Sequence, residues 1–222
     1  MRIACVGYRD WALNIYDFLA RSTNHQFLIL RSRDQYDEYA IKDFKPDLVL
    51  FYGWSWIISS SLVNKFSCIM LHPSPLPKYR GGSPIQNQIL RGENVSAVSI
   101  FLMDEGVDTG PILSQKPLSL DGGISEIFTR ITKIGSEITL QLLEHGLQPV
   151  SQNNEDATIY SRIKPKDNEI TTNELRTMPV KYLYNKIRML QAPYPGAFIR
   201  TVDGYRLVIT EAYIDECFND YE

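Results

Sequence analysis

One stretch of the sequence, residues 68–91 (CIMLHPSPLPKYRGGSPIQNQILR), limits what this chain can fold into more than any other. It starts with an apolar run that suits a short buried strand, and His72 stands at the end of that strand. Pro73, Pro75 and Pro77 follow, and prolines at this density exclude helix and sheet, so the next segment is a stiff, extended loop. An imidazole at the end of a strand is typical of the ligand sites of open α/β sheets.

The second half of the same stretch predicts a helix. Gly81 and Gly82 allow the backbone to turn after the loop. Residues 83–91 then suit a helix with Ser83 as its N-cap and Pro84 at its first position. The sequence therefore predicts a strand, a rigid loop and a helix in succession, with the histidine beside the N-terminus of the helix.

The first 150 residues alternate between apolar runs and segments with helical spacing. Strands are predicted at residues 2–8, 27–30, 47–52, 68–71, 95–103 and 112–120. Helices are predicted at residues 10–21, within 31–45, and at 59–65, 83–91 and 121–145. This alternation favours a Rossmann-like, doubly wound and mostly parallel α/β sheet, which we assign to a catalytic domain over residues 1–150.

The character of the sequence changes after residue 150. Residues 151–158 (SQNNEDAT) are polar and rich in turn formers, so we predict a linker there. Residues 159–222 predict a small α+β appendage with a helix near 180–190 and a hairpin around Val202-Asp203-Gly204. This short segment has little chain with which to bury its apolar residues, so we predict that it serves self-association in a homodimer. Those residues are Leu183, Ile187, Leu190, Phe198, Leu207 and Ile209.

Composition excludes several classes of protein. A length of 222 residues suits one large domain, or one domain with a small appendage. The net charge of −3 and a pI near 5.7 argue against a nucleic-acid partner. The three cysteines, Cys5, Cys68 and Cys217, fit no disulfide framework, and the first two suit buried free thiols. The sequence starts with a predicted strand and has no long apolar run, so we expect a soluble cytoplasmic protein without membrane contact.

His72 and Asp108 are the strongest candidates for chemistry. They lie at or just beyond the ends of two successive predicted strands, 36 positions apart. If these strands are neighbours, both side chains face one crevice. A carboxylate beside an imidazole orients the ring and favours its charged form, which makes a positioned general acid or base. The alternative is a histidine that only caps a loop.

Other kinds of site are poorly supported. Asp104, Glu105 and Asp108 form an acidic turn, but they lack EF-hand spacing and offer few oxygen ligands, so we predict no metal. The first predicted strand leads into GYRDWA rather than a GxGxxG phosphate loop. No GxSxG motif is present either, which excludes that type of serine nucleophile.

These motifs resemble a known family. HPSPLPKYRGGSPIQ, followed by the aspartate of DEGVDTGPIL, resembles the formyltransferases that use N10-formyltetrahydrofolate. YSRIKPKDNEI and APYPGAF resemble, more weakly, the linker and the following segment of the methionyl-tRNA and sugar N-formyltransferases. The resemblance implies an enzyme that transfers a formyl group from N10-formyltetrahydrofolate to an amine, without a metal.

The resemblance also implies roles for three positions. His72 would assist removal of a proton from the acceptor amine and stabilise the tetrahedral intermediate, and Asp108 would orient and charge it. The family has an asparagine two residues before the histidine that holds the formyl oxygen, whereas this chain has Met70. Methionine cannot donate a hydrogen bond. Either the amide of Gln86 or Asn87 replaces the asparagine, or Met70 simply packs and the histidine acts alone.

Folate recognition, on the same resemblance, falls to two loops. The pterin would enter between the loop after the strand at 47–52 and the loop around residue 108. Trp54 and the nearby Trp56 suit core aromatics equally well. The implied folate residues are Tyr52, Gly53 and Trp54, with the backbone of Asp104, Glu105, Gly106, Val107 and Asp108.

The resemblance leaves several acceptors open. Methionyl-tRNA formyltransferases carry a full C-terminal barrel, for which the roughly 65 residues after the predicted linker are too few. Phosphoribosylglycinamide formyltransferases have a glycine- and serine-rich phosphate loop, unlike GYRDWA. We therefore predict that the acceptor is a nucleotide-linked 4-amino-4,6-dideoxy sugar (such as a dTDP-amino sugar) of surface-polysaccharide synthesis, as in lipopolysaccharide O-antigen. The alternatives are those two formyltransferases, or a non-catalytic relative that binds folate or a nucleotide sugar.

Predicted substrate contacts follow from that choice of acceptor. Lys78 and Arg80 would meet the diphosphate and Gln86 the sugar, although the two cations also suit a solvated basic turn. The full set of predicted substrate residues is Lys78, Arg80, Gly82, Gln86 and Asn87.

Overall fold

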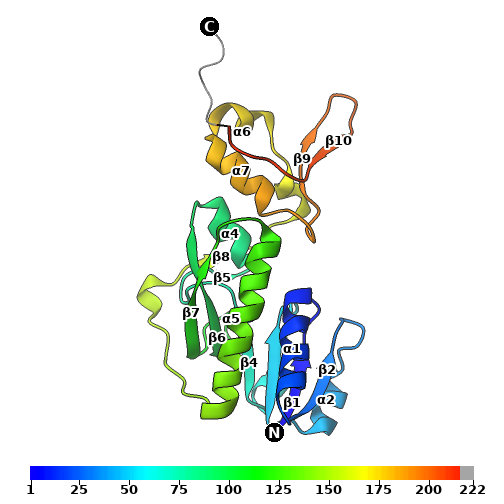
Figure 1. The fold of residues 1–222 in the computed structure, drawn as a ribbon, viewed down its shortest axis with the longest axis vertical. Helices are drawn as coiled ribbons and strands as arrows, with labels where there is room; N and C mark the ends of the chain where they lie inside the picture. The colour runs from blue at the N-terminus through cyan, green and yellow to red at the C-terminus, as the bar shows by residue number, and fades with distance from the viewer. Residues whose placement is uncertain (216–222) are drawn as a thin grey trace.

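A computed structural model describes residues 1–215, and Cys217 and the rest of the predicted appendage up to residue 222 lie outside the described residues. Its centre is a six-stranded sheet in the order β2-β1-β3-β4-β6-β7 (Figure 1). The first four strands of this order run parallel, and β6 and β7 each run antiparallel to the strand before them. The strands are β1 Arg2–Val6, β2 Gln26–Leu30, β3 Leu48–Tyr52, β4 Cys68–His72, β6 Val95–Leu102 and β7 Ile112–Ser119.

Helices cover both faces of this sheet, so the predicted Rossmann-like, mostly parallel α/β fold is confirmed. The helices are α1 Asp10–Ser22, α2 Glu38–Phe44, α3 Ser60–Val63, α4 Pro84–Leu90, α5 Ile124–His145, α6 Thr172–Thr177 and α7 Val180–Arg188, with 3-10 turns at Asn154–Asp156 and Pro165–Asn168. Two short pairs complete the structure: β5 Arg80–Gly81 with β8 Ile159–Tyr160, and the predicted hairpin of β9 Ala197–Arg200 with β10 Arg206–Ile209. Helix α6 and the β5–β8 pair were not predicted.

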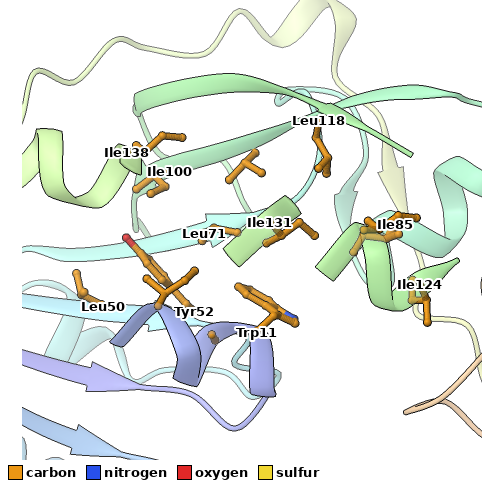
Figure 2. Close-up of a cluster of buried hydrophobic side chains, with 14 of the residues drawn as sticks. Trp11, Leu50, Tyr52, Leu71, Ile85, Ile100, Leu118, Ile124, Ile131 and Ile138 are labelled. Atoms are coloured by element: carbon orange, nitrogen blue, oxygen red, sulfur yellow. The ribbon is translucent and has the colours of Figure 1, made fainter. Parts of the chain in front are cut away.

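Two apolar clusters hold the sheet, one on each face. On the first face, α1 and α5 pack against alternate strand residues such as Leu50 and Leu71 (Figure 2). On the other face, Ile41 of α2 and Leu62 of α3 pack against the intervening strand residues. Helix α1 shows why the sequence forms this layer, because its buried side chains recur every three or four residues. Those side chains are Trp11, Ala12, Ile15, Tyr16 and Leu19.

The two described cysteines are free and buried, as predicted. Burial raises the pKa of the Cys68 thiol to about 12 and that of Cys5 well above its ordinary value. Both thiols are therefore protonated and inert near neutral pH. Within residues 1–215, no helix combines the length and the apolar character needed to cross a membrane.

The segment predicted as a linker is attached to the first part of the chain. Thr158 accepts a backbone hydrogen bond from Arg80, and β8 extends this contact by pairing with β5. The chain then leaves for a separate unit of α6, α7, β9 and β10, which sits beyond α4 at the end of the molecule opposite the N-terminus (Figure 1). The domain division stays a prediction, but the departure point lies near residue 161.

The argument for self-association loses part of its basis. Ile187, Leu190 and Phe198 are only 8, 3 and 5% exposed, because the appendage buries them itself or packs them against the first unit. Leu207 is 59% exposed, so some apolar surface remains. A homodimer stays a prediction.

Candidate active site

His72 is the last residue of β4, which puts its ring at the C-terminal end of the strand. The side chain is buried, with its Nε2 atom 2.7 Å from the carbonyl oxygen of Tyr79 and its Nδ1 atom 3.5 Å from Oδ2 of Asp108. The backbone N–H of Gly81 donates to the same carboxylate oxygen, at 2.8 Å. The rigid loop after β4 thus surrounds the ring and also positions the aspartate beside it.

Asp108 reaches the histidine by a different route from the one predicted. The prediction assumed that both residues follow strands ending at the same edge of the sheet. Strand β6 is antiparallel to β4, however, so its last residue, Leu102, pairs with Ile69 near the start of β4. The loop of residues 103–111 must therefore fold back toward His72. Asp108 has a left-handed backbone (φ 54°), which aspartate tolerates better than most residues.

The proton positions of this pair follow from the two neighbours of the ring. A carbonyl oxygen only accepts hydrogen bonds, so Nε2 of His72 carries a proton toward Tyr79. The other ring nitrogen, Nδ1, faces the carboxylate of Asp108. Both nitrogen atoms of the ring therefore face fixed acceptors, in a place largely shielded from water.

Hydrogen bonds hold the proline-rich loop in place. Gln88 donates from Nε2 to the carbonyl of Pro73, and the hydroxyl of Ser99 donates to the carbonyl of Ser74. The Ser74 hydroxyl donates in turn to the carbonyl of Lys78. The histidine is therefore fixed by its strand on one side and by a hydrogen-bonded loop on the other.

A cleft of about 260 Å³ opens beside His72. Arg9, Arg162 and Lys164 line it together with the residues that follow β3 and β4, and no acidic residue of the described chain lines it. The three cations of this cleft contrast with the net charge of −3 of the whole chain. The lining of the cleft suits an anionic ligand.

The predicted substrate residues separate into two groups. Gly82 and Gln86 line the cleft, whereas Lys78 lies outside it. Arg80 is only 4% exposed, and its guanidinium donates to the side-chain oxygens of Gln152 and Asn154. It therefore ties the predicted linker to the first unit and cannot meet a diphosphate without leaving those partners.

Helix α4 starts at Pro84 as predicted, but its N-terminus differs in detail. Ser83 stands before it with a left-handed backbone (φ 50°) and makes no side-chain cap. Its hydroxyl instead accepts a hydrogen bond from the backbone N–H of Ile163. Asn87 donates from Nδ2 to the carbonyls of Gly82 and Ser161, among others. Both residues thus hold the chain segment that brings Arg162 to the cleft, and Asn87 does not line it.

The first loop predicted for folate is partly core. Tyr52 is fully buried, and its hydroxyl bonds with that of Thr139, so its side chain lies in the hydrophobic core. Gly53 and Trp54 line the cleft, although Trp54 is only 8% exposed. Further along the same loop Ile57 is 99% exposed, and sequence reasoning missed this apolar side chain.

The second loop, residues 104–108, is organised by its own side chains. Asp104 accepts hydrogen bonds from the N–H of Gly106 and the hydroxyl of Thr109. Glu105 accepts a hydrogen bond from Asn64, which follows α3. Val107, which lies between Glu105 and Asp108 in the sequence, is 61% exposed. The described residues contain no group of three potential metal ligands from His, Cys, Asp or Glu. The second folate loop thus contacts the chain that follows α3, through Glu105 and Asn64.

Met70 packs rather than bonds. It is half-buried in β4 and lies against the second apolar cluster, which includes Cys68 and Phe51. Strand alternation puts Met70 on the same side of β4 as His72, two residues on. A thioether therefore occupies the position at which the family resemblance expects an amide donor.

Some residues of the cleft were missed at the sequence level. Arg9 lies in the short turn between β1 and α1, so its place near the end of a parallel strand could have been inferred. Arg162 and Lys164 belong to the YSRIKPKDNEI segment, whose position depends on contacts with residues about 80 positions earlier, such as Ser83 with Ile163. No local signal indicates such a contact.

The sheet, the buried His–Asp pair and the adjoining cleft define the class of this protein, an α/β domain with a histidine–carboxylate pair beside a cleft at the end of a central strand. Comparison with known proteins gives the family. Residues 16–143, more than half of the chain, match the family described as "Formyl transferase", and the chain belongs to that family.

Two relatives resemble the chain over most of its length. The methionyl-tRNA formyltransferase of a Nitratiruptor species is 32% identical over 174 residues, which cover 77% of this chain and 55% of that protein. The solved structure of the methionyl-tRNA formyltransferase from Clostridium thermocellum is 33% identical, with a TM-score of 0.88, and the match covers 97% of this chain and 94% of that one. The chain thus spans about half the length of the curated relatives it matches.

These findings overturn the predicted sugar acceptor. A 4-N formyltransferase from Francisella tularensis matches with a TM-score of 0.75, but it is only 17% identical over 96% of this chain and 98% of that one, so this likeness shows the fold alone. The prediction relied on chain length, whereas this chain aligns over 97% of its length with a methionyl-tRNA formyltransferase structure. It also relied on the acidic pI, which does not describe the cleft.

Proposed function

We propose that this chain transfers the formyl group of N10-formyltetrahydrofolate to the amino group of methionyl-tRNA. One observation supports this most directly, namely that three cations and, among the described residues, no carboxylate line the cleft beside His72. An aminoacyl-tRNA presents its amine next to a phosphodiester backbone, and basic side chains at the mouth of a site bind such a backbone. The similarity to methionyl-tRNA formyltransferases supports the same acceptor.

In this proposal His72 and Asp108 act on the atoms that change charge. The acceptor amine attacks the formyl carbon, and the carbonyl oxygen gains negative charge. His72, which Asp108 orients at 3.5 Å, can exchange a proton with the reacting nitrogen atoms through Nδ1, whereas the charge on the oxygen requires a donor of its own. Collapse of the intermediate breaks the bond from the formyl carbon to N10, which takes up the proton that the amine has lost.

The folate is proposed to bind at the loops after β3 and β6, from which Gly53 and Trp54 line the cleft and Asp108 reaches His72. Each loop also carries an exposed apolar side chain, Ile57 and Val107. Apolar side chains at the rim of a site suit the flat pterin ring, and the backbone groups of residues 104–108 suit its polar edge.

The test is a transfer assay with purified protein, N10-formyltetrahydrofolate and methionyl-tRNA. We expect formyl transfer by the unaltered chain, and a loss of about 10²–10⁴ in kcat for His72→Ala, the usual size of a general acid–base contribution. Absence of transfer to methionyl-tRNA by the folded chain would exclude the proposed acceptor.

A matched pair of lysines tests the role of the basic cleft. Lys164 lines the cleft, whereas Lys166 lies two residues away on the 3-10 turn and is exposed outside it. We expect Lys164→Ala to raise KM for methionyl-tRNA and to reduce its dependence on salt, and Lys166→Ala to change neither. Equal effects of the two variants would mean that the cleft does not select the anionic acceptor.

A further inference from the structure

Two buried side-chain nitrogen atoms in the described residues have no hydrogen-bond partner, and both belong to residues that line the cleft beside His72. They are Nε1 of Trp54 and Nε2 of Gln86. Both atoms are donors, and an unsatisfied buried donor is costly unless a ligand satisfies it. The cleft is therefore prepared for a ligand that brings oxygen acceptors.

Helix α4 carries three consecutive amides, and their use separates Gln86 from its neighbours. Asn87 donates to the backbone carbonyls of Gly82, Ser83 and Ser161. Gln88 donates to the carbonyls of Pro73 and Pro84. The structure therefore decides between the two amides considered as replacements for the family asparagine, because the donor of Asn87 is already used and that of Gln86 is not.

Gln86 is also held in place. It is 3% exposed and lies in the first turn of α4, shortly after Pro84. Tyr194 lies beside Gln86. Burial raises the pKa of the Tyr194 hydroxyl, and the neighbouring Gln86 amide lowers it. The two groups do not form a hydrogen bond of normal geometry, so Nε2 of Gln86 has no partner. A donor that is buried, restrained and unused suits a charge that develops only during a reaction.

The reaction creates such a charge. When the amine nitrogen bonds to the formyl carbon, the π electrons of the C=O bond move to the oxygen, and they return when the bond to N10 breaks. Met70 cannot donate to this oxygen. The ring nitrogens of His72 already face Tyr79 and Asp108. A further donor is required on the cleft side of the histidine.

We propose that Gln86 supplies this donor, with its Nε2 bonding to the formyl oxygen in the transition state in place of the asparagine that Met70 replaces. The inference rests on the proposed function, since it concerns the same formyl transfer. It makes Gln86 a catalytic residue that acts on kcat rather than a residue that only binds the acceptor.

The first experiment measures kcat and KM of Gln86→Met and Gln86→Glu, which remove the donor at similar side-chain length. We expect kcat to fall by about 10²–10³, the usual effect of removing one oxyanion donor, with KM for methionyl-tRNA within about twofold. Thermal stability should not fall, because Nε2 forms no bond in the folded protein. A kcat within about threefold of the unaltered enzyme, or a rise in KM at constant kcat, would overturn the proposal.

The second experiment is a rescue. Met70→Asn in the Gln86→Met background puts an amide at the family position, and we expect it to restore at least about tenfold in kcat. A purely structural role of Gln86 would not be rescued in this way. A folded double variant without recovery would mean that the two positions do not serve the same oxygen. Trp54→Phe removes the other unused donor, and a loss of kcat there without a loss in Gln86→Met would assign the role to Trp54.

A binding measurement separates this inference from the choice of acceptor. Calorimetry compares 10-formyl-5,8-dideazafolate, a stable folate analogue with a formyl group, with its unformylated counterpart. We expect the unaltered chain to prefer the formylated analogue by about three- to tenfold, and Gln86→Met to lose that preference. A preference that persists in the variant contradicts the inference. The Gln86→Met variant could lose the preference while the unaltered chain transfers nothing to methionyl-tRNA. That combination would support the role of Gln86 and exclude only the proposed acceptor.

Discussion

Strand β3 and helix α7 show two different ways of burying a segment in the same molecule. All residues of β3, Leu48–Tyr52, are apolar or aromatic and lie in the sheet core. Helix α7, Val180–Arg188, buries Ile187 together with the polar side chains of Asn185, Lys186 and Arg188. The first segment is held by contact area, which has no direction, and the second by hydrogen bonds, which need particular partners.

The polar side chains of α7 reach backbone carbonyls. Asn185 donates to the carbonyl of Ile89 in α4, and Arg188 donates to those of Leu120 and Gly122. Lys186 donates to the carbonyl of Glu169 within the C-terminal unit. The unit is thus fixed against the first part of the chain by a small number of directional bonds, in addition to apolar contacts.

The difference matters because the cleft lies between the two parts. His72 belongs to the sheet, whereas Arg162 and Lys164 come from the chain that leads into the C-terminal unit, and Tyr194 lies within that unit, between α7 and β9. The core therefore positions His72, and the polar contacts position the other side of the cleft. Loss of one type of contact should affect stability and activity differently from loss of the other.

The largest effect should come from the apolar core. Leu50→Ala in β3 removes a fully buried side chain, so we expect the free energy of unfolding to fall by about 2–5 kcal/mol, from lost transfer energy and the cavity left behind. Chemical denaturation measures this change. Val202→Ala, at an exposed apolar site in the hairpin turn, should change it by less than about 0.5 kcal/mol. Similar losses at both sites would contradict the comparison.

A smaller and more local effect should follow loss of a docking bond. Arg188→Met keeps the length of the side chain but leaves the carbonyls of Leu120 and Gly122 without this donor, which costs about 1–3 kcal/mol. We expect hydrogen exchange to accelerate in α6 and α7 before the sheet, and KM for the acceptor to rise more than kcat falls. Arg200→Met, at a half-exposed arginine on β9, is the matched control and should do neither. If hydrogen exchange accelerated equally in the sheet and in the C-terminal unit, the two parts would not be held by separate contacts.

The smallest effect concerns Glu174, which links α6 to α7. Burial by itself would raise the pKa of Glu174, but hydrogen bonds from Lys186 and Thr171 outweigh it and lower the pKa below 4.5. A carboxylate with a lowered pKa stabilises the fold above its unfolded pKa, and this contribution is lost as the pH falls through the folded value. We expect Glu174→Gln to cost about 1 kcal/mol at pH 7 and almost nothing near pH 3. Unfolding measured at both pH values tests this, and a constant difference between the two proteins would contradict it.

Local signals in the sequence were sufficient for most of the fold. The apolar runs of β3 and β4, the prolines after His72 and the helical spacing of α5 each depend on residues a few positions apart. The short helix α6 escaped prediction, although Thr171 and Glu174 form a capping box at its start. The pairing of β5 with β8 escaped it because each strand has only two residues.

The candidate site shows a partial success of the same reasoning. The spacing of His72 and Asp108 indicated a pair, and the two side chains lie together. The reason given for it was wrong, because the apolar run of β6 carries no information on the direction in which the strand enters the sheet. The catalytic roles of the pair remain predictions.

The amino-acid sequence was enough to establish the α/β sheet, the imidazole at the end of β4 and the methionine at the family's asparagine position, because these are properties of neighbouring residues. Contacts between distant residues established the rest: that Arg80 is enclosed by Gln152 and Asn154, that three cations meet at one cleft, and that Gln86 keeps a free donor while that of Asn87 is used. A side chain's type states which bonds it can form, and the packing of the whole chain determines which of those bonds are already made.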